Sequence, residues 1–333
     1  MATIYEVSEL AGVSLATVSR VMNDSGRVSP KTREKVLAAM QELDYQPNSI
    51  AQSLASKTSN CVGVLVSELH GPIFGALVSS IEEELRKAGK FTIFAVGHSD
   101  EAKEKEGINF LISRNCDALI LHLEAISDQE LLEQKDNIIP FALINRSIQG
   151  LEGNCISLNN ELGGYQATKL LLEMGHRDIA YISGPLGWLD ASGRLAGHKR
   201  ALAEFDVAFN PQLMIEGNYL VIGGEEAMQQ LFEQNAPFTA VVCANDEMAV
   251  GAMDVIRSRG LSIPDDISIV GFDNVRWAPF LSPKLSTVNN PIREIGRMAA
   301  YWVLKYVYGQ SDQDIQSVFE PVLIKRESAG SIN

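Results

Sequence analysis

Three polar residues, Arg194, Asn245 and Asp273, lie next to strongly apolar segments and carry side chains suited to a ligand rich in hydroxyl groups. Asp273 directly follows the apolar residues 267–272, Asn245 follows residues 240–244, and Arg194 opens a predicted helix after a turn rich in glycine and serine. A carboxylate accepts hydrogen bonds from two hydroxyl groups, a guanidinium donates in a fixed fork, and an amide does either. The three residues together therefore suit the neighbouring hydroxyl groups of a sugar.

Each of these residues also has an ordinary structural interpretation. Asn245 and Asp246 could cap the helix that follows them, Asp273 could cap a helix or form a turn, and Arg194 could form a surface ion pair. Side-chain chemistry leaves both interpretations open, so the elements that would position the residues have to be considered.

From Cys61 onward, apolar runs typical of strands alternate with amphipathic helices. Strands are predicted at 62–66, 91–96, 118–123, 141–144, 179–183, 240–244 and 267–272, helices at 73–89, 103–115, 160–175, 194–205, 223–234, 246–259 and 291–308, and a last apolar run at 318–325. This alternation predicts an α/β fold in which helices cover both faces of parallel sheets, and the span is long enough for two sheets. Ligands bind at the carboxyl ends of the strands in such sheets, where the three polar residues fall.

The first 45 residues predict a separate small helical domain. Short helices are expected at 4–11, 15–22 and 31–44. Gly12 ends the first helix and Ser14 can cap the second, so about three residues connect them. This is the outline of a helix-turn-helix motif.

The second of these helices has a surface suited to reading DNA. Val18 and Val21 point inward, and the outward-facing residues are Leu15, Ala16, Thr17, Ser19 and Arg20. In a helix-turn-helix these positions enter the major groove. Leu15 and Ala16 offer apolar contact to a thymine methyl group, and Arg20 can bind a guanine or a phosphate. An ordinary helical hairpin in a small α-domain is the alternative.

Residues 49–56 have a helical pattern that follows a break at Pro47. A helix needs on the order of 12–15 residues to persist alone in water, so this segment should fold only when something holds it. Ile50 and Leu54 share one face of it. A plain linker is the alternative.

The charges are divided unevenly along the chain. The formal net charge is -14, but residues 1–60 hold six basic and six acidic side chains, so residues 61–333 carry the whole excess. The negative total charge disfavours DNA binding by the surface as a whole. A neutral N-terminal domain can still present a local basic patch.

Several classes of protein are disfavoured. Cys61, Cys116, Cys155 and Cys243 lie far apart beside apolar runs, which indicates buried thiols rather than disulfides or a metal site. The N-terminus lacks the pattern of a signal peptide, and no run approaches the ~18–20 apolar residues of a membrane span. We therefore expect a cytoplasmic protein without a membrane partner.

The sequence also lacks the common signatures of catalysis. It contains no G-x-G-x-x-G after a strand, no G-x-x-x-x-G-K-[ST], no H-E-x-x-H and no G-x-S-x-G, and its five histidines are scattered. We expect no enzyme, no cofactor and no metal, although many enzymes share the predicted α/β architecture.

Motifs along the whole chain resemble the lactose and galactose repressor (LacI/GalR) family of transcriptional regulators. They are residues 3–7, 11–23, 28–30, 45–48 and 51–55, then Gly184-Pro185, Arg194-Leu195-Ala196-Gly197, and residues 244–252, 269–273 and 285–287, all in the family's order. Residues 143–146 and 223–228 make the chain most similar to the galactose repressor branch.

The resemblance implies a definite domain organisation. The expected parts are a helix-turn-helix headpiece at 1–45, a hinge helix at 46–58, and a two-lobed core like that of periplasmic binding proteins, built of two parallel α/β sheets. One lobe takes 60–158 plus 291–319 and the other 160–289 plus 321–330.

The resemblance also implies two sets of functional residues. The implied DNA contacts are Thr3, Tyr5, Ser14, Leu15, Ala16, Thr17, Ser19, Arg20, Asn23, Asn48, Ala51 and Leu54. The implied contacts to a small-molecule effector are Phe74, Asn145, Arg194, Tyr219, Asn245, Asp273 and Asn290. Two hinge helices, one per subunit, would pair in the minor groove, where Leu54 would wedge between base steps and kink the DNA.

The function implied is that of a repressor of sugar-utilisation genes. A small sugar, similar to galactose or a glycoside, would bind between the core lobes and release the repressor from a pseudo-palindromic operator. Some members of the family instead use a corepressor, and some activate promoters.

The chain departs from the family pattern in ways that affect this expectation. Several relatives have a second acid where Asn274 stands, and Asn290 occupies another effector position, so the hydroxyl pattern that is read is open. The pair Leu15-Ala16 is more similar to the corresponding residues of galactose repressors than to those of the lactose repressor. The sequence lacks the C-terminal leucine-heptad tail of lactose-type tetramers, so a homodimer is expected.

The wedge hypothesis predicts the behaviour of the variant Leu54→Ala. Loss of the side chain should weaken binding to the specific operator much more than binding to non-specific DNA, because only the kinked specific complex uses the wedge. Gel-shift titrations with both kinds of duplex measure the two affinities, and an equal loss on both would refute the hypothesis.

Overall fold

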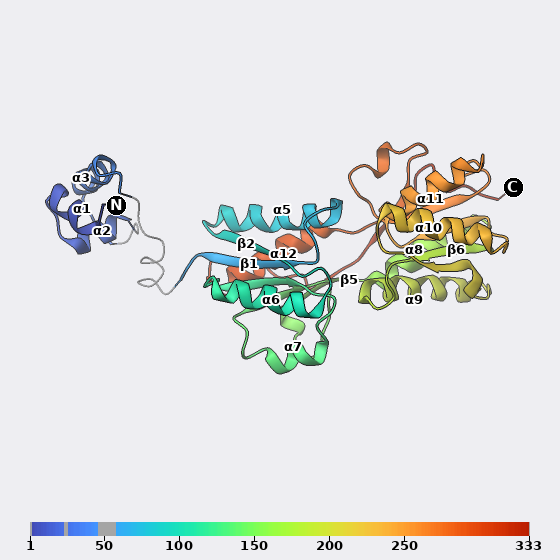
Figure 1. Cartoon of the computed structure of the whole chain (residues 1–333), viewed down its shortest axis with the longest axis horizontal. Helices are drawn as coiled ribbons and strands as arrows, with labels where there is room; N and C mark the ends of the chain where they lie inside the picture. The colour runs from blue at the N-terminus through green and yellow to red at the C-terminus, as the bar shows by residue number, and fades with distance from the viewer. Residues whose placement is uncertain (1, 23–25, 46–57, 333) are drawn as a thin grey trace. The chain divides into compact units, whose positions relative to one another are not determined.

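The computed structural model describes residues 2–22, 26–45 and 58–332 (Figure 1). Contacts divide the chain into two units, with the boundary between Asn60 and Cys61. Apart from Thr58, the predicted hinge helix at 46–58 lies outside the described residues.

The N-terminal unit holds three helices: α1 (Ile4–Ala11), α2 (Leu15–Met22) and α3 (Pro30–Glu42). The first two have the predicted bounds, and the third begins one residue earlier and ends two residues earlier than predicted. Gly12 adopts a left-handed conformation with φ 64°, which ends α1 and turns the chain into α2. A small apolar core holds the helices together and contains Val7, Ala11, Val18, Val21, Val36 and Ala39.

The first sheet of the core unit is entirely parallel, with strand order β11-β5-β4-β3-β1-β2. Its strands are β1 (Cys61–Val66), β2 (Phe91–Val96), β3 (Ala118–His122), β4 (Phe141–Ile144), β5 (Cys155–Leu158) and β11 (Val318–Phe319). The central strands β1, β3 and β4 are aliphatic and almost fully buried, as a sheet covered on both faces requires.

The second sheet has strand order β12-β10-β9-β8-β6-β7. Its strands are β6 (Ile179–Ser183), β7 (Met214–Glu216), β8 (Ala240–Cys243), β9 (Ser268–Asp273), β10 (Ser286–Asn289) and β12 (Val322–Ile324). The edge strand β12 pairs with β10 in the antiparallel direction, and the other pairings are parallel. The predicted fold of two parallel α/β sheets is confirmed, with this one antiparallel edge.

Helices cover both sheets. The first sheet has α5 (Pro72–Lys87), α6 (Glu101–Ser113), α7 (Asp128–Gln134) and α12 (Ile292–Tyr306), and the second has α8 (Asn160–Glu173), α9 (Leu189–Glu204), α10 (Val221–Glu233) and α11 (Asp246–Ser258). Helices α5 and α12 pack together although more than 200 residues separate them, and α6 packs on β1 and β2 from the other side (Figure 1).

The chain passes between the two sheets three times. It leaves the first sheet after β5, returns from β10 into α12, and leaves again from β11 into β12. All segments that join the sheets therefore lie close to the carboxyl ends of β5 and β10, at the edge where a ligand is expected.

Among the described α-helices and strands, the sequence did not predict α7, β5, β7 and β10. Strand β10 has the polar sequence Ser-Thr-Val-Asn, yet Ser286 and Thr287 are fully buried because Ser328 and Asp246 satisfy them. Helix α9 begins at Leu189, five residues before the predicted start, so Arg194 lies in its second turn rather than at its first residue.

Helices α8 and α9 approach each other unusually closely. A Cβ atom at Gly164 would lie 2.0 Å from the carbonyl oxygen of Arg194, and one at Gly197 would lie 1.9 Å from the carbonyl oxygen of Glu161. Only glycine fits at these contacts, which fix the height of α9 above the second sheet.

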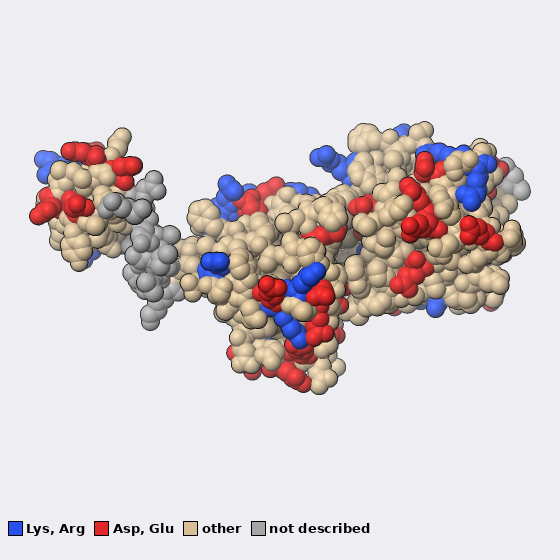
Figure 2. Space-filling view, in the orientation of Figure 1, with Lys and Arg blue, Asp and Glu red and all other residues tan. Residues whose placement is uncertain are grey.

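The surface and the thiols agree with the composition. Figure 2 shows Asp and Glu side chains spread over the visible face of the core unit, which carries the acid excess. Cys116, Cys155 and Cys243 are buried as expected, and Cys61 is half-buried. Within the described part of the chain, no helix is both long and apolar enough to cross a membrane.

A buried carboxylate fixes the loop after β3. Glu104 is 1% exposed and accepts hydrogen bonds from the backbone N–H groups of Glu124, Ala125 and Ile126 at 2.8 to 3.2 Å. Three backbone donors, that of Ile126 buried and the other two partly buried, therefore depend on one side chain.

We expect Glu104→Ala to lower the free energy of unfolding of the core unit by about 3 kcal/mol, because it leaves these three donors without a partner. Urea unfolding followed by tryptophan fluorescence measures the loss. The control is Glu106→Ala, an exposed position in the same helix. An equally small effect of both variants would contradict the assigned role of Glu104.

Candidate functional site

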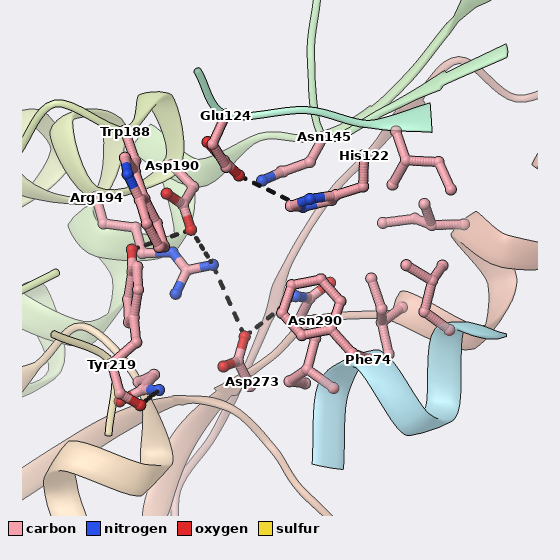
Figure 3. Close-up of a pocket in the computed structure, with 16 residues that line it drawn as sticks. Phe74, His122, Glu124, Asn145, Trp188, Asp190, Arg194, Tyr219, Asp273 and Asn290 are labelled. Atoms are coloured by element: carbon pink, nitrogen blue, oxygen red, sulfur yellow. Dashed lines mark hydrogen bonds and ion pairs between the residues drawn. The ribbon is translucent and has the colours of Figure 1, made fainter. Parts of the chain in front are cut away.

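A pocket opens in the core unit where the carboxyl ends of both sheets meet (Figure 3). It is lined by Ile73, Phe74, Leu77, His122, Glu124, Ile144, Asn145, Trp188, Asp190, Arg194, Tyr219, Asn245, Asp273, Asn290, Ile292 and Ile295. All seven residues predicted to contact an effector are among them. The structure thus brings together residues that are spread over more than 200 positions of the sequence.

Arg194 is the central cation of the pocket. Its side chain is 5% exposed and its guanidinium lies 3.8 Å from the centre of the Phe272 ring. Nε donates to Asn160 Oδ1 at 2.9 Å and Nη1 donates to the carbonyl oxygen of Ala244. The alternative of a surface ion pair is therefore wrong.

The remaining nitrogen of Arg194 faces two carboxylates. Nη2 lies 3.6 Å from Asp190 Oδ2 and 3.7 Å from Asp273 Oδ1. Both distances exceed that of a hydrogen bond, so Nη2 balances the two charges without a direct bond to either. Burial raises the pKa of Asp273, and Arg194 opposes this shift.

Asp273 and Asn290 present complementary groups to the pocket. Asp273 ends β9 with φ 101°, a conformation that non-glycine residues rarely adopt, and Asn290 Nδ2 donates to its Oδ1 at 3.1 Å. Asn290 Oδ1 is buried and has no hydrogen-bond partner among the described residues. An unsatisfied acceptor at this place is suited to a hydroxyl group of a ligand.

Asn245 also has a structural role. It is the N-cap of α11: its Oδ1 accepts from the backbone N–H of Met248 at 2.9 Å, while its Nδ2 donates to the carbonyl oxygen of Tyr219 at 2.8 Å. The capping interpretation is thus confirmed for Asn245. Asp246, its neighbour, is fully buried and bonds instead to Thr287 and the backbone N–H of Val275.

Asn145 and Asn274 differ in their relation to the pocket. Asn145 has φ 61°, and its Oδ1 accepts from Asn160 Nδ2 at 3.3 Å, so Asn160 joins it to Arg194. Asn274 does not line the pocket and instead bonds to Arg326 and Asn289.

Aromatic rings form two walls of the pocket. Trp188 and Tyr219 lie 5.7 Å apart with an interplanar angle of 33°, and the Tyr219 hydroxyl donates to Asp190 Oδ2 at 3.0 Å. Phe74 meets His122 edge to face at 5.1 Å. Aromatic walls beside a few convergent polar groups are typical of small-molecule sites.

The sequence interpretation missed His122, Glu124, Trp188 and Asp190. The signal for the first two was available, because His122 lies near the end of the predicted strand at 118–123 and Glu124 directly follows it, as Asn245 and Asp273 follow theirs. Trp188 and Asp190 lie in the stretch taken for a glycine-rich turn.

His122 and Glu124 form a buried pair of titratable groups. His122 Nε2 lies 3.5 Å from Glu124 Oε1, and its Nδ1 lies 3.2 Å from Ser67 Oγ. Burial lowers the pKa of His122 to about 4, so its imidazole is neutral at pH 7. Burial, with the nearby charge of Asp190, raises the pKa of Glu124 to about 8.

The N-terminal unit places the predicted DNA contacts at the start of two helices. Thr3 and Glu6 form a capping box on α1, and Ser14 Oγ accepts from the backbone N–H of Thr17 at 3.2 Å. The exposed or half-buried predicted contacts are Thr3, Tyr5, Ser14, Leu15, Ala16, Thr17, Ser19 and Arg20. Asn23, Asn48, Ala51 and Leu54 lie outside the described residues.

Burial in this unit agrees with the predicted orientation of α2. Val18 and Val21 are 0% and 4% exposed, whereas Ala16 and Arg20 are exposed. The α1–Gly12–α2 arrangement has the geometry of a helix-turn-helix motif. Contact of these residues with DNA stays a prediction.

Comparison with known proteins agrees with both units. The family profile "Bacterial regulatory proteins, lacI family" matches residues 3–48, and the profile "Periplasmic binding protein-like domain" matches residues 168–329. Among the residues that the structure describes, no cluster of His, Cys, Asp and Glu could hold a metal ion.

Relatives match over nearly the full length. The chain is 39% identical over 331 residues to the HTH-type transcriptional regulator GalR of Escherichia coli, covering 99% of this chain and 96% of GalR. It is 35% identical over 332 residues to the ribose operon repressor of Haemophilus influenzae, covering 100% of both.

Solved structures show the same architecture. The lac repressor dimer bound to operator and the anti-inducer ONPF matches with a TM-score of 0.87 and 31% identity, over 99% of each chain. The complex of the regulator CelR with cellobiose matches with a TM-score of 0.72 and 30% identity, over 99% of this chain and 100% of CelR.

A helix-turn-helix unit joined to a core like that of periplasmic binding proteins defines a DNA-binding transcriptional regulator. The chain belongs to the LacI/GalR family of bacterial regulatory proteins. The resemblance inferred from the sequence is confirmed, and the relatives are regulators rather than enzymes.

The titration of Glu124 gives a testable prediction. Its pKa is raised to about 8 on folding, so the folded protein holds a proton that the unfolded protein has already released. The free energy of unfolding therefore falls as the pH rises from about 6.5 and levels off near pH 8.5, above the folded pKa. His122 titrates below this window. Removal of the carboxyl in Glu124→Gln should reduce the decrease in the free energy of unfolding over this range by about 2 kcal/mol.

Urea unfolding at the two pH values measures this difference. Glu204→Gln, an exposed carboxyl at the far end of α9, is the control and should unfold with the pH dependence of the original chain. The assignment is wrong if Glu124→Gln and the original chain lose stability in parallel.

Proposed function

We propose that the chain is a sequence-specific, cytoplasmic transcriptional repressor of sugar-utilisation genes. It would bind a pseudo-palindromic operator as a homodimer and be released when a small sugar occupies the core pocket. Binding rather than catalysis is the role proposed for the pocket. The observation that carries this proposal is the convergence of Asp273, Arg194 and the unsatisfied Asn290 Oδ1 beside the aromatic walls.

The geometry favours a ligand with several adjacent hydroxyl groups. The Asp273 carboxylate offers free lone pairs and Asn290 Oδ1 an unused one, so two neighbouring hydroxyl groups could donate to them. The rings of Trp188, Tyr219 and Phe74 are placed to cover the C–H faces of a sugar ring. Solved relatives support this class, since CelR is bound to cellobiose in the same fold.

The predicted contact residues keep their proposed roles. Phe74, Asn145, Arg194, Tyr219, Asn245, Asp273 and Asn290 would bind the effector. The exposed side chains of α2 would enter the major groove, and the segment around Leu54 would bind the minor groove.

Regulation follows from linkage. The effector would favour an arrangement of the core lobes in which the two hinge segments of the dimer no longer pair, so effector and operator weaken each other's binding reciprocally. Such couplings are typically about 1–3 kcal/mol.

A thermal-shift screen of neutral sugars and sugar phosphates, followed by operator release with each hit, tests the proposal. A sugar that stabilises the protein and releases it from a pseudo-palindromic duplex supports it. Binding to DNA should fall steeply with salt. Stabilisation by a purine and by no sugar would contradict the sugar effector, and a sugar that strengthens operator binding would make it a corepressor.

The variant Asp273→Asn tests the role of the pocket. Exchange of the carboxylate for an isosteric amide should weaken effector binding at least tenfold, since a charged hydrogen bond of about 1.5–3 kcal/mol is lost. Operator affinity in the absence of effector should persist. Isothermal titration and gel shift measure the two affinities.

The matched control is Asp265→Asn at an exposed position far from the pocket lining. It should retain the effector affinity of the original chain. Equal effector affinity of Asp273→Asn and the control would remove Asp273 from the site.

A further inference from the structure

The pocket holds more acid than base. Glu124, Asp190 and Asp273 have side chains that are 7%, 11% and 8% exposed, and Arg194 is the one side chain that is positively charged at pH 7 among the residues that line the cavity, because the imidazole of His122 is neutral. A buried charge requires a hydrogen-bond or ionic partner. The contacts among these four side chains therefore show which carboxyl group lacks one.

Arg194 already balances the charges of the two aspartates. Its Nη2 lies between Asp190 and Asp273, and its other nitrogens bond to Asn160 and to the backbone of Ala244. Asp190 and Asp273 have further donors of their own: the first accepts from the Tyr219 hydroxyl, and the second from Asn290.

Glu124 has no comparable partner. Among the described residues no hydrogen bond reaches its carboxyl group, and its one close contact, His122 Nε2 at 3.5 Å, belongs to a neutral imidazole. Figure 3 shows the carboxyl groups of Glu124 and Asp190 at the same end of the pocket, and the charge of Asp190 acts on Glu124.

The other charged groups near Glu124 are already paired. Arg146 bonds to Asp128 and donates to the carbonyl oxygen of Ile126 at 2.7 Å. Glu104, behind the loop, accepts from the backbone of residues 124–126 and adds further negative charge. The described cations near it, Arg146 and Arg194, lower the pKa of Glu124 through space, but neither donates a hydrogen bond to its carboxyl group.

We propose that Glu124, together with Asp190, forms a subsite for a positively charged nitrogen on the effector, so that the pocket prefers an amino sugar or an amine-bearing glycoside to a neutral or acidic sugar. The inference rests on the proposed sugar-binding function and specifies the class of sugar. Without ligand, Glu124 keeps a proton at neutral pH. An ammonium group displaces this proton and donates to both carboxylates.

The same arrangement disfavours anionic effectors. A phosphate or carboxylate at this end of the pocket would face the charge of Asp190, and loss of the Glu124 proton would add a second like charge, in a cavity of low polarity where repulsion is poorly screened. The nearest base, Arg194, is already shared between two carboxylates.

The experiment compares matched sugars on the full chain by isothermal titration at pH 7. The probes are galactose, galactosamine, 6-amino-6-deoxygalactose and galacturonate, with the corresponding glucose series. We expect one amino sugar to bind at least tenfold more tightly than its neutral parent, and the acid to bind at least tenfold more weakly.

The variant Glu124→Gln separates charge from shape. It should bring the ratio of amino-sugar to neutral-sugar affinity close to one, because the amide keeps the shape of the side chain but cannot carry a negative charge. Glu204→Gln, which removes the same charge from an exposed position, should keep the advantage. Thermal unfolding of each variant checks that it is folded.

The outcomes distinguish this inference from the function on which it rests. If neutral sugars bind and release operator, but no amino sugar binds better, the cation subsite is refuted and the repressor function stands. The same holds if Glu124→Gln retains the advantage, or if it weakens the neutral sugar instead, which would make Glu124 a protonated donor. If no sugar of any charge binds, the sugar effector and the subsite fail together.

Discussion

The burial of one guanidinium group governs the arrangement of the core. A charged side chain that is removed from water needs partners on every side, and Arg194 obtains them from elements far apart in the sequence: a ring on β9, an amide at the start of α8, a carbonyl after β8 and carboxylates from α9 and β9. None of these elements can shift alone without leaving a charge or a donor unsatisfied. The pocket is therefore shaped largely by the requirements of a residue that belongs to its own wall.

The close contact of α8 and α9 makes this burial possible. Because Gly164 and Gly197 allow the two helix backbones to touch, Arg194 is held low enough over the sheet for its guanidinium to lie over the Phe272 ring. A side chain at either glycine would lift α9 and separate the cation from the ring. The motif Arg194-Leu195-Ala196-Gly197 thus couples a ligand-site residue to the contact that positions it.

The fold could be predicted for segments whose own pattern of apolar residues determines their structure. Aliphatic runs such as β1 and β4 and amphipathic helices such as α1 and α2 were evident, since their burial follows from their own residues. Strand β10 was not, because Ser286 and Thr287 become core residues only through partners more than 40 positions away. Likewise, the positions of Asn245 and Asp273 at strand ends indicated that they could belong to a site. The burial of Glu124 and the bonding of the Asn245 side chain depend on tertiary contacts that a local pattern does not contain.

Two of the segments that join the sheets carry an asparagine that lines the pocket or bonds to residues that line it. Asn160 stands just after the first crossing and links Asn145 of one sheet to Arg194 of the other, and Asn290 stands on the second crossing with its acceptor unused. These short connections are the pivots about which two lobes of this kind can turn. Under the proposed function, an effector held by Asn290 would act directly on the pivot. Its binding would be converted into backbone torsion, and a small displacement at the axis would become a larger one at the rim of each lobe.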